Sequence, residues 1–416
     1  MLTKNEQIKQ TRLQTRERRK NQVCKVFEVK IDKSHLSRGK KDFLKMLFVE
    51  AKWMYNYQLS LEDSFSLSYK TKEVEVLNKE RQKEKRKIEC LSARMRQALV
   101  ERTKQNILNL SKAKRKGSKI GRLKFKSQVN SIPLEQYGMT HKILNRSYVK
   151  IQGMGRKSLK AIGLLQIPKE AEIANSNLTQ RNGDYYLKIT TFLPKEERIK
   201  TEKFIGLDFG IKDSITDSDG NKYNFQFPEP KQLKKAQREV SRKRKGSNNR
   251  NKQKLVLNKQ YEKITNKKKD ARNKFVSKIV KENDLIVIQD ESIAGWKSSR
   301  MRGFGRKIQH SIMGGIISSL KNKPETLVID KFFPSTQICP VCGALNKHEL
   351  DQRIYSCSCG YSEDRDIHAA RNILNEGLKQ LDREPIKTIP VEKWSSGTFG
   401  PKTCFVEAGS LWFSHG

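Results

Sequence analysis

The stretch FIGLDFGI (204–211) is an apolar run interrupted by a single acid, Asp208. Two more segments place an acid beside an apolar run: LIVIQDES (285–292) contains Glu291, and DRDIHAARNIL (364–374) contains Asp366. Short apolar runs of this kind are typical of strands buried in an α/β sheet. We expect the fold to bring the three segments together, and carboxylates gathered from distant segments can hold two Mg²⁺ ions on a phosphate.

Each acid also has a purely structural interpretation. Asp208 could form a turn at a strand end, and Asp364 and Asp366 could cap the Ala-rich helix that follows them. In the second segment, strand alternation predicts that Gln289 and Glu291 share one face while Asp290 points to the other. Because Gln289 has no negative charge, we expect Glu291 to be the ligand and Asp290 to be a cap or a salt-bridge partner.

The charge balance indicates a polyanionic partner. The 416 residues include 87 Lys and Arg against 45 Asp and Glu, a net charge of +42. Self-repulsion of this size disfavours a compact state unless a polyanion neutralises it, which nucleic acid would do. A ribosomal-type or otherwise simply basic protein is the alternative. We find no apolar run of ~18 residues and expect no membrane span; the basic N-terminus lacks the apolar stretch of a secretory signal.

Four of the seven cysteines are clustered. Cys24, Cys90 and Cys404 are scattered, which indicates a reducing compartment rather than a disulfide framework. The other four form two close pairs, Cys339/Cys342 and Cys357/Cys359, a pattern that predicts one structural Zn²⁺ held by four thiolates. The second pair departs from the usual spacing, with one intervening residue instead of two.

The pattern of apolar and polar residues predicts that the two halves of the chain differ in secondary structure. Residues 23–32 read as a strand, 42–61 as an amphipathic helix and 76–113 as a charged helical segment, and strands follow the cationic run 112–126 up to about residue 200. The first half is therefore expected to be a β-rich module with a helical insertion. In the second half we expect a hairpin through Asp219-Gly220, two long antiparallel helices between 230 and 282, strands at 284–289 and 326–333, and helices at 308–321 and 366–379. This order indicates an α/β unit with a mixed sheet.

The ordered motifs GLDFG, LIVI followed by an acid, CPVCG, CSCGY and DRDIHAARNIL resemble the TnpB family, transposon-encoded RNA-guided nucleases related to compact type V CRISPR effectors. KVFEVKI and EAKWMYNYQL look like the N-terminal start of that family, so the similarity covers most of residues 20–375. The resemblance implies a multidomain α+β chain: a β-rich wedge module with a helical recognition insertion, then a RuvC nuclease domain of ribonuclease-H-like α/β fold with an inserted zinc ribbon. The implied divisions are 1–38 (wedge, with a basic N-terminal arm), 39–120 (recognition lobe), 121–200 (wedge), 201–333 (RuvC), 334–362 (zinc ribbon), 363–382 (RuvC) and 383–416 (a disordered tail).

The resemblance also implies site residues. Asp208 and Asp366 match the first and third catalytic acids, while many relatives have Glu where this chain has Gln289 and Asn where it has His368. With Glu291 in the place of the missing acid, the expected magnesium ligands are Asp208, Glu291 and Asp366. The expected nucleic-acid-binding residues are Lys114, Arg115, Lys116, Lys119, Arg122, Arg242, Lys243, Arg244 and Lys245.

Two functions are compatible with these features. The first is a magnesium-dependent, RNA-guided DNA endonuclease that binds a guide RNA and double-stranded target DNA next to a short flanking motif. The second is a nuclease-dead, RNA-guided DNA-binding regulator, which would be favoured if Glu291 cannot reach the metal ions. In either case the expected location is the prokaryotic cytoplasm, in association with the nucleoid.

Overall fold

The computed structural model describes residues 3–382, except 79, 81, 197, 212, 299–303, 348, 350 and 351. The predicted disordered tail, 383–416, and with it Cys404, lies outside the described residues. The chain divides into two units, Met1–Arg198 and Ile199 onward. Within the described residues, no helix is both long enough and apolar enough to cross a membrane.

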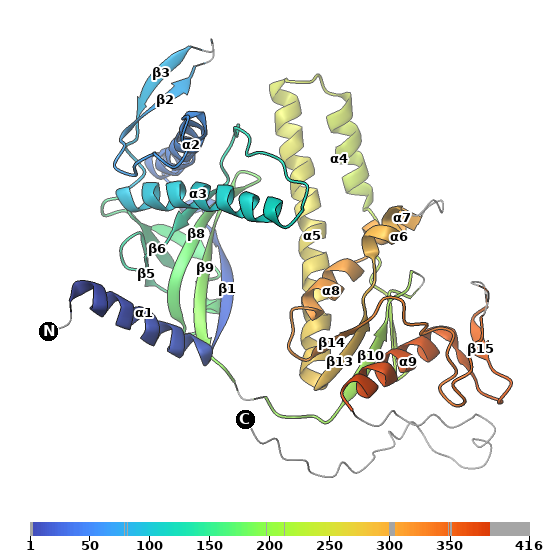
Figure 1. The fold of residues 1–416 in the computed structure, drawn as a ribbon. Coiled ribbons are helices and arrows are strands. Elements are labelled where there is room, and N and C mark those ends of the chain that lie inside the picture. Colours follow the sequence, from blue (N-terminus) through green and yellow to red (C-terminus); the bar gives the residue numbers. More distant parts are fainter. Residues whose placement is uncertain are drawn as a thin grey trace. The chain divides into compact units, whose positions relative to one another are not determined.

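The first unit is built on a seven-stranded antiparallel sheet (Figure 1). Its strands, in spatial order, are β4 (Ser131–Leu134), β8 (Glu172–Arg181), β9 (Asp184–Pro194), β1 (Gln22–Ile31), β7 (Leu159–Ile162), β6 (Tyr148–Ile151) and β5 (His141–Asn145). Asn182 and Gly183 both have positive φ, and they join the paired residues Arg181 and Asp184 in a tight hairpin. This is the turn that an Asn-Gly pair predicts. The predicted β-rich module is therefore present.

Helices α1 (Lys4–Lys20), α2 (Arg38–Ser60) and α3 (Ala93–Arg115) complete the first unit. The Ser37 side chain accepts a hydrogen bond at the start of α2, and the Ser92 side chain does the same for α3. Leu44, Leu47 and Met54 of α2 are at most 1% exposed, and they pack with the sheet residues in one core.

The helix predicted over residues 76–113 is correct only from Ala93 onward. Residues before it form a hairpin of β2 (Glu73–Leu77) and β3 (Lys83–Lys87), in which Glu75 lies opposite Lys85. Opposite charges across a strand pair stabilise the hairpin. The buried carboxylate of Glu50 then accepts hydrogen bonds of 2.8–2.9 Å from the N–H groups of residues 89–91. Those amides are thereby used by a tertiary contact and not by a helix.

The second unit contains a five-stranded mixed sheet in the order β12-β11-β10-β13-β14. Its strands are β10 (Phe204–Asp208), β11 (Ile215–Asp217), β12 (Lys222–Tyr223), β13 (Leu285–Gln289) and β14 (Thr326–Ile329). The first three are antiparallel neighbours, whereas β10, β13 and β14 run parallel. Both the mixed sheet and the hairpin through Asp219-Gly220 are confirmed.

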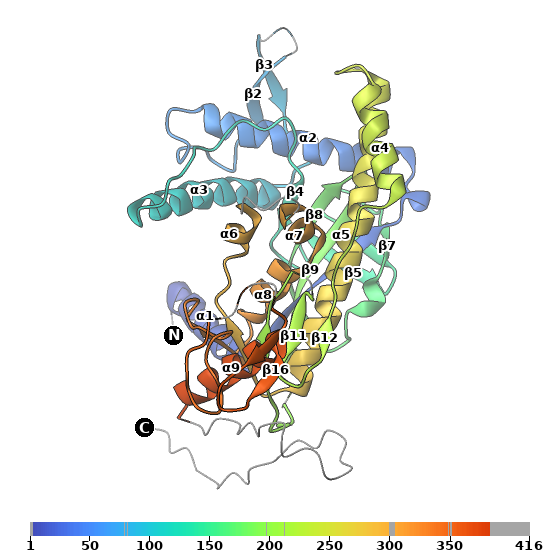
Figure 2. The same ribbon diagram turned by 90° about the vertical axis from the view of Figure 1, so that its right-hand side faces the viewer.

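Helices cover both faces of this sheet. Ile205, Leu207 and Ile288 pack on one face with residues of α5 (Asn248–Glu282) and α8 (Met313–Leu320). Val287 packs on the other with Ile373, Leu374 and Leu378 of α9 (Arg365–Gln380), the side from which Figure 2 views the sheet. Helix α9 lies so close to β10 that a Cβ atom on Gly206 would come within 2.1 Å of the Ala370 carbonyl oxygen. Only glycine allows this approach.

The remaining helices agree with the sequence pattern except in one place. Helices α4 (Lys231–Arg242) and α5 pair beside each other, as predicted for 230–282, and α6 (Ile293–Ser298) follows β13 (Figure 1). The single helix predicted over 308–321 is two, α7 (Phe304–His310) and α8. The Ser311 hydroxyl donates to the Ile308 carbonyl at 2.9 Å and closes the end of α7.

Candidate functional site

Asp208 is the last residue of β10, at the carboxyl end of the parallel strands. Phe204 packs with the α9 core and Gly206 contacts α9 directly, so strand alternation places Asp208 on the same face of the sheet. The pairing of Leu207 with Ile288 puts Asp208 beside Gln289 of β13. Asp208 therefore lies half-buried where β10, β13 and α9 come together.

The two acids at the start of α9 have different roles. The Asp364 side chain accepts hydrogen bonds from the N–H groups of Asp366 (3.0 Å) and Ile367 (3.3 Å), and it pairs with Lys222 at 2.7 Å. Asp364 is therefore the helix cap, the structural role that the sequence analysis offered for Asp364 and Asp366. Asp366 lies in the first turn of α9, half-buried, with its carboxylate not needed as a cap.

The strand alternation used to predict the direction of Glu291 does not extend to that residue. Strand β13 ends at Gln289, and the N–H of Glu291 donates to the Gln289 carbonyl at 2.9 Å, so the chain turns at Asp290. Asp290 is exposed and forms an ion pair with Lys321, as expected of a salt-bridge partner. Glu291 is half-buried just before α6, and the turn rather than the strand pleat places it there.

The electrostatics connect the three predicted acids. Burial raises the pKa of Asp208 to about 7, and the negative charges of Asp366 and Glu291 contribute to that increase. Burial also raises the pKa of Glu291, with a further contribution from Asp290. Like charges raise a carboxyl pKa only at short range. The fold thus brings the three segments together at one end of the sheet.

Substitution of Asp208 by Asn tests this crowding without any reaction. The folded pKa of Asp208 lies above its ordinary 3.8, so the folded protein retains a proton that the unfolded chain loses, and stability falls as pH rises from about 4 through 7. Asp208→Asn should therefore raise the melting temperature of the magnesium-free protein at pH 8, by roughly 3 °C, with little gain near pH 4. Thermal melts across this pH range measure the difference.

Asp290→Asn is the matched control, because Lys321 lowers the pKa of that exposed carboxyl. Its substitution should not stabilise the protein at pH 8. Equal melting temperatures for the two variants at pH 8 would contradict the crowding of charge around Asp208.

The four predicted cysteines come together in the second unit. Their four sulfur atoms lie within 4.8 Å of one another, close enough to bind a single metal ion. Among the described residues, no other group of three or more His, Cys, Asp or Glu side chains is arranged in this way. Among the same described residues, Asp208, Glu291 and Asp366 do not form such a group. Each cysteine pair is closed by a turn: the N–H of Gly343 donates to the Cys339 carbonyl (2.9 Å), and the N–H of Gly360 donates to the Cys357 carbonyl (3.0 Å).

The short second pair does not prevent this arrangement. Strands β15 (Ile354–Ser356) and β16 (Ser362–Asp364) form a hairpin around Cys357 and Cys359 and direct both sulfurs to the first pair, at 3.5 Å in each case. A hydrogen bond from the backbone N–H of Cys359 is the main reason that the pKa of Cys357 is lowered, to about 6. This hydrogen bond favours the thiolate form of Cys357. Four sulfurs in this arrangement fit a tetrahedral Zn²⁺ site.

The predicted nucleic-acid-binding cations occupy two surfaces, one in each unit. Lys114 and Arg115 end α3, Lys116 is its C-cap, and Lys119 and Arg122 follow in an irregular segment; all five are exposed. Arg242 ends α4, and Lys243, Arg244 and Lys245 lie in the turn before α5. A third basic element is α1, whose predicted role is that of an N-terminal arm.

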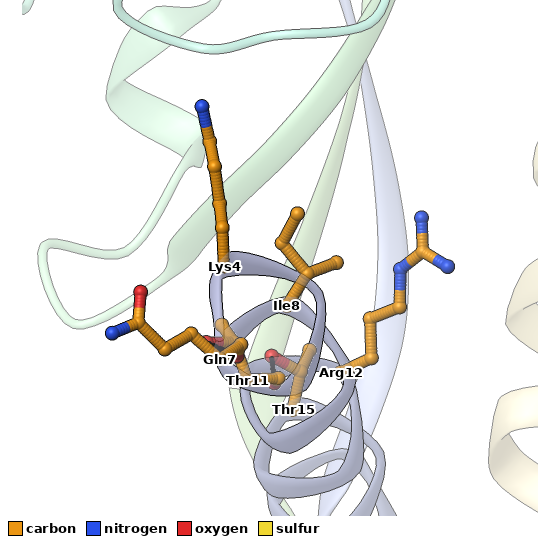
Figure 3. A pocket seen from close by; sticks show the side chains of 6 residues that line it. All are labelled: Lys4, Gln7, Ile8, Thr11, Arg12 and Thr15. Carbon is orange, nitrogen blue, oxygen red and sulfur yellow. Dashed lines mark hydrogen bonds between the residues drawn. The ribbon is translucent and has the colours of Figure 1, made fainter. Parts of the chain in front are cut away.

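A shallow hollow along α1 is lined by Lys4, Gln7, Ile8, Thr11, Arg12 and Thr15 (Figure 3). All six come from one helix at spacings of three and four residues, and α1 has no buried residue. The hollow therefore belongs to an exposed helix face and is not an enclosed binding site. It lies in the first unit, whereas the carboxylates and cysteines lie in the second.

A buried polar network was missed by the motif analysis. It consists of Gln289, Ser335, His368 and Asn372, each at most 6% exposed. The sequence contained one signal for it, because His368 and Asn372 are four residues apart and so share a face of α9.

Known proteins resemble this chain, and the matches to two family models lie mostly in the second unit. Residues 185–300 match the OrfB_IS605 family, described as a probable transposase, and residues 320–373 match the Cas12f1-like TNB domain. The structure superposes on Cas12f1 in its complex with sgRNA and target DNA with a TM-score of 0.51, covering 85% of this chain and 99% of that chain at 12% identity. The fold class is therefore that of Cas12f1.

Curated relatives carry the same resemblance. A putative RNA-guided DNA endonuclease of Streptomyces pristinaespiralis is 36% identical over 188 residues, covering 43% of this chain and 46% of the relative. InsQ of Escherichia coli K12, also named a putative RNA-guided DNA endonuclease, is 30% identical over 256 residues, covering 53% and 62%. The TnpB-like protein L770 of Acanthamoeba polyphaga mimivirus is 26% identical over 249 residues, covering 52% and 45%. The chain spans about half the length of these relatives, and the resemblance to the TnpB family is confirmed.

Proposed function

We propose that this chain is an RNA-guided DNA endonuclease. Its active site, formed by Asp208, Glu291 and Asp366, cleaves phosphodiester bonds of the target DNA. The observation that carries the proposal is the convergence of these three acids, from distant segments, on one end of the mixed sheet, where Asp366 and Glu291 raise the pKa of Asp208. Two of the relatives described above carry the name of this activity.

The donor set fits hard divalent cations. Three carboxylates supply the anionic oxygens that Mg²⁺ prefers. Asp208, Glu291 and Asp366 would hold the ions, whose chemistry when bound would be activation of a water molecule and stabilisation of the leaving oxygen. The protein holds Asp208 at a strand end, leaves Asp366 uncapped because Asp364 is the cap, and places Glu291 by the turn after β13.

The other regions supply nucleic-acid binding in this proposal. Residues 1–38 and 121–200 act as the wedge and 39–120 as the recognition lobe, while 201–333 and 363–382 form the RuvC nuclease around the zinc ribbon at 334–362. A structured guide RNA neutralises much of the +42 charge, and base pairing with the guide selects the DNA target. The exposed cations at the end of α3 and in the α4–α5 turn contact phosphates.

A regulator without cleavage activity is the second function that the sequence allowed. It would be favoured if Glu291 could not reach the metal ions; the contribution of the Glu291 charge to the raised pKa of Asp208 supports the endonuclease instead. The endonuclease is therefore the function that we put forward.

RNA that co-purifies with the full chain tests the proposal. Sequencing should find one dominant species that ends in a variable segment, and the complex should cut DNA matching that segment when Mg²⁺ is added. A heterogeneous RNA population would contradict guidance, and matched DNA that is bound but never cut would establish the regulator instead.

The cations that follow α3 lead to a separate prediction. Replacing Lys114, Arg115 and Lys116 by Ala should weaken RNA binding and reduce the slope of its salt dependence by roughly one for each lost phosphate contact. Binding measured at several salt concentrations gives the slope. Lys114→Arg with Lys116→Arg retains the charge and should retain the slope; an unchanged slope in the Ala variant would mean that these residues are only a solvated surface.

A further inference from the structure

The resemblance to the TnpB family implies an acid at the position of Gln289, yet the surroundings of this residue are suited to an amide. Its Nε2 donates to the carbonyl oxygens of Asp330 (3.2 Å), Lys331 (3.2 Å) and Phe333 (2.7 Å), and its Oε1 accepts from the Ser335 hydroxyl (3.1 Å). The side chain is 5% exposed. A carboxylate here would place its negative charge against three carbonyl oxygens and could not donate to any of them.

The network continues from Ser335 to α9. Nδ2 of Asn372 donates to the Ser335 carbonyl and to the Ile338 carbonyl, both at 2.7 Å. The segment held in this way, 335–338, leads directly into Cys339, the first residue of the cysteine cluster. Gln289 and Asn372 therefore attach the entry of the cluster to β13 on one side and to α9 on the other.

His368 joins the same helix to the far side of the cluster. Its Nε2 lies 3.1 Å from Nδ2 of Asn372, and its Nδ1 lies 3.4 Å from the hydroxyl of Tyr361. Its ring stacks on Tyr355 with 3.8 Å between centroids. Tyr355 and Tyr361 flank Cys357 and Cys359 in the β15–β16 hairpin, and they form the small core of the cluster together with Cys339. His368 is fully buried, two residues after Asp366.

We propose that Gln289, His368 and Asn372 are positioning residues that couple the cysteine cluster to the nuclease carboxylates, so that an ordered cluster holds Asp366 in place beside Asp208. The inference rests on the proposed function for its consequence in cleavage. The contacts join two elements to the cluster: helix α9, which carries Asp366, and strand β13, which lies beside β10 and precedes Glu291. Gln289 is in this view a positioning residue and not a metal ligand.

The Gln289→Glu variant distinguishes two hypotheses: that Gln289 positions the cysteine cluster, and that Gln289 merely replaces an acid that would bind Mg²⁺. Positioning predicts a melting temperature lower by on the order of 5 °C, release of zinc to a chelator roughly tenfold faster, and a higher Mg²⁺ concentration for half-maximal cleavage. A lost ligand predicts the opposite: faster cleavage at lower Mg²⁺ with an unchanged melting temperature. The second result would overturn the proposal.

Milder variants keep the proposal testable if the Gln289→Glu protein does not fold. Ser335→Ala removes the hydroxyl donor to Gln289, whereas Ser335→Thr retains a hydroxyl. His368→Phe retains a ring on Tyr355 but loses both polar contacts. We expect faster zinc release and a higher Mg²⁺ requirement for Ser335→Ala and His368→Phe, with rescue in Ser335→Thr. Zinc release and Mg²⁺ requirement identical to those of the unmodified protein would overturn the coupling.

The readouts also separate this inference from the proposed function. If the unmodified complex never cuts DNA, the proposed function fails, but zinc release by the full chain still tests whether the network holds the cluster. If the complex cuts and zinc release does not respond to the three variants, the function stands and the coupling fails.

Discussion

Asp208→Ala, Glu291→Ala and Asp366→Ala should each lower the rate of cleavage of guide-matched DNA by roughly 10³-fold or more, with DNA binding nearly unchanged. In the proposed mechanism each substitution removes one of the few anionic oxygens able to hold Mg²⁺ on the scissile phosphate, whereas guide and target would be held by cations and base pairing. Single-turnover cleavage and a filter or gel binding assay, with the same RNA-loaded complex, measure the two quantities separately.

Asp290→Ala is the control for this set because Asp290 is the acid next to Glu291 in sequence. The Asp290 side chain is exposed and paired with Lys321. The Asp290→Ala variant should therefore still cleave DNA, with at most a small loss of stability. If Glu291→Ala still cleaves while Asp290→Ala does not, our placement of the turn after β13 is wrong.

Loss of the cysteine cluster should have the second largest effect. Cys339→Ser, or removal of metal by a strong chelator, should unfold residues 334–362 locally, because a hairpin with a core of Cys339, Tyr355 and Tyr361 buries too little surface to order itself. Protection of its amides from hydrogen exchange should fall to that of an open loop. Metal analysis of the pure protein should find about one equivalent of zinc, and less than about half would count strongly against the site.

Cys24→Ser provides the comparison. Cys24 is an exposed thiol on β1 of the first unit, outside the cluster, and its replacement should leave zinc content and hydrogen exchange at 334–362 unchanged. Equal loss of zinc in the two variants would mean that the metal is not held by the cluster.

The sequence alone predicted most of the second unit. Apolar runs at 204–211 and 284–289 predict buried strands, the charged stretch between 230 and 282 predicts two paired helices, and closely spaced cysteines predict a metal site, because each of these signals is local. Asp208 and Asp366 could be predicted as candidates for the same reason, because each lies at the end or the start of an element whose type its own neighbours in the sequence decide. The family resemblance rested on the order of these local motifs, and the comparisons bear it out.

Tertiary contacts decided what local signals could not. Residues 76–92 have helical propensity, but cross-strand charge pairs and the buried Glu50 carboxylate turn them into a hairpin and a turn. The position of Glu291 depends on where β13 stops, and Gln289 depends on three carbonyl groups more than 40 residues away in the chain. A hydrogen-bonding partner so distant leaves no pattern in the neighbouring sequence, so only the folded chain shows that this amide is a fixed part of the site.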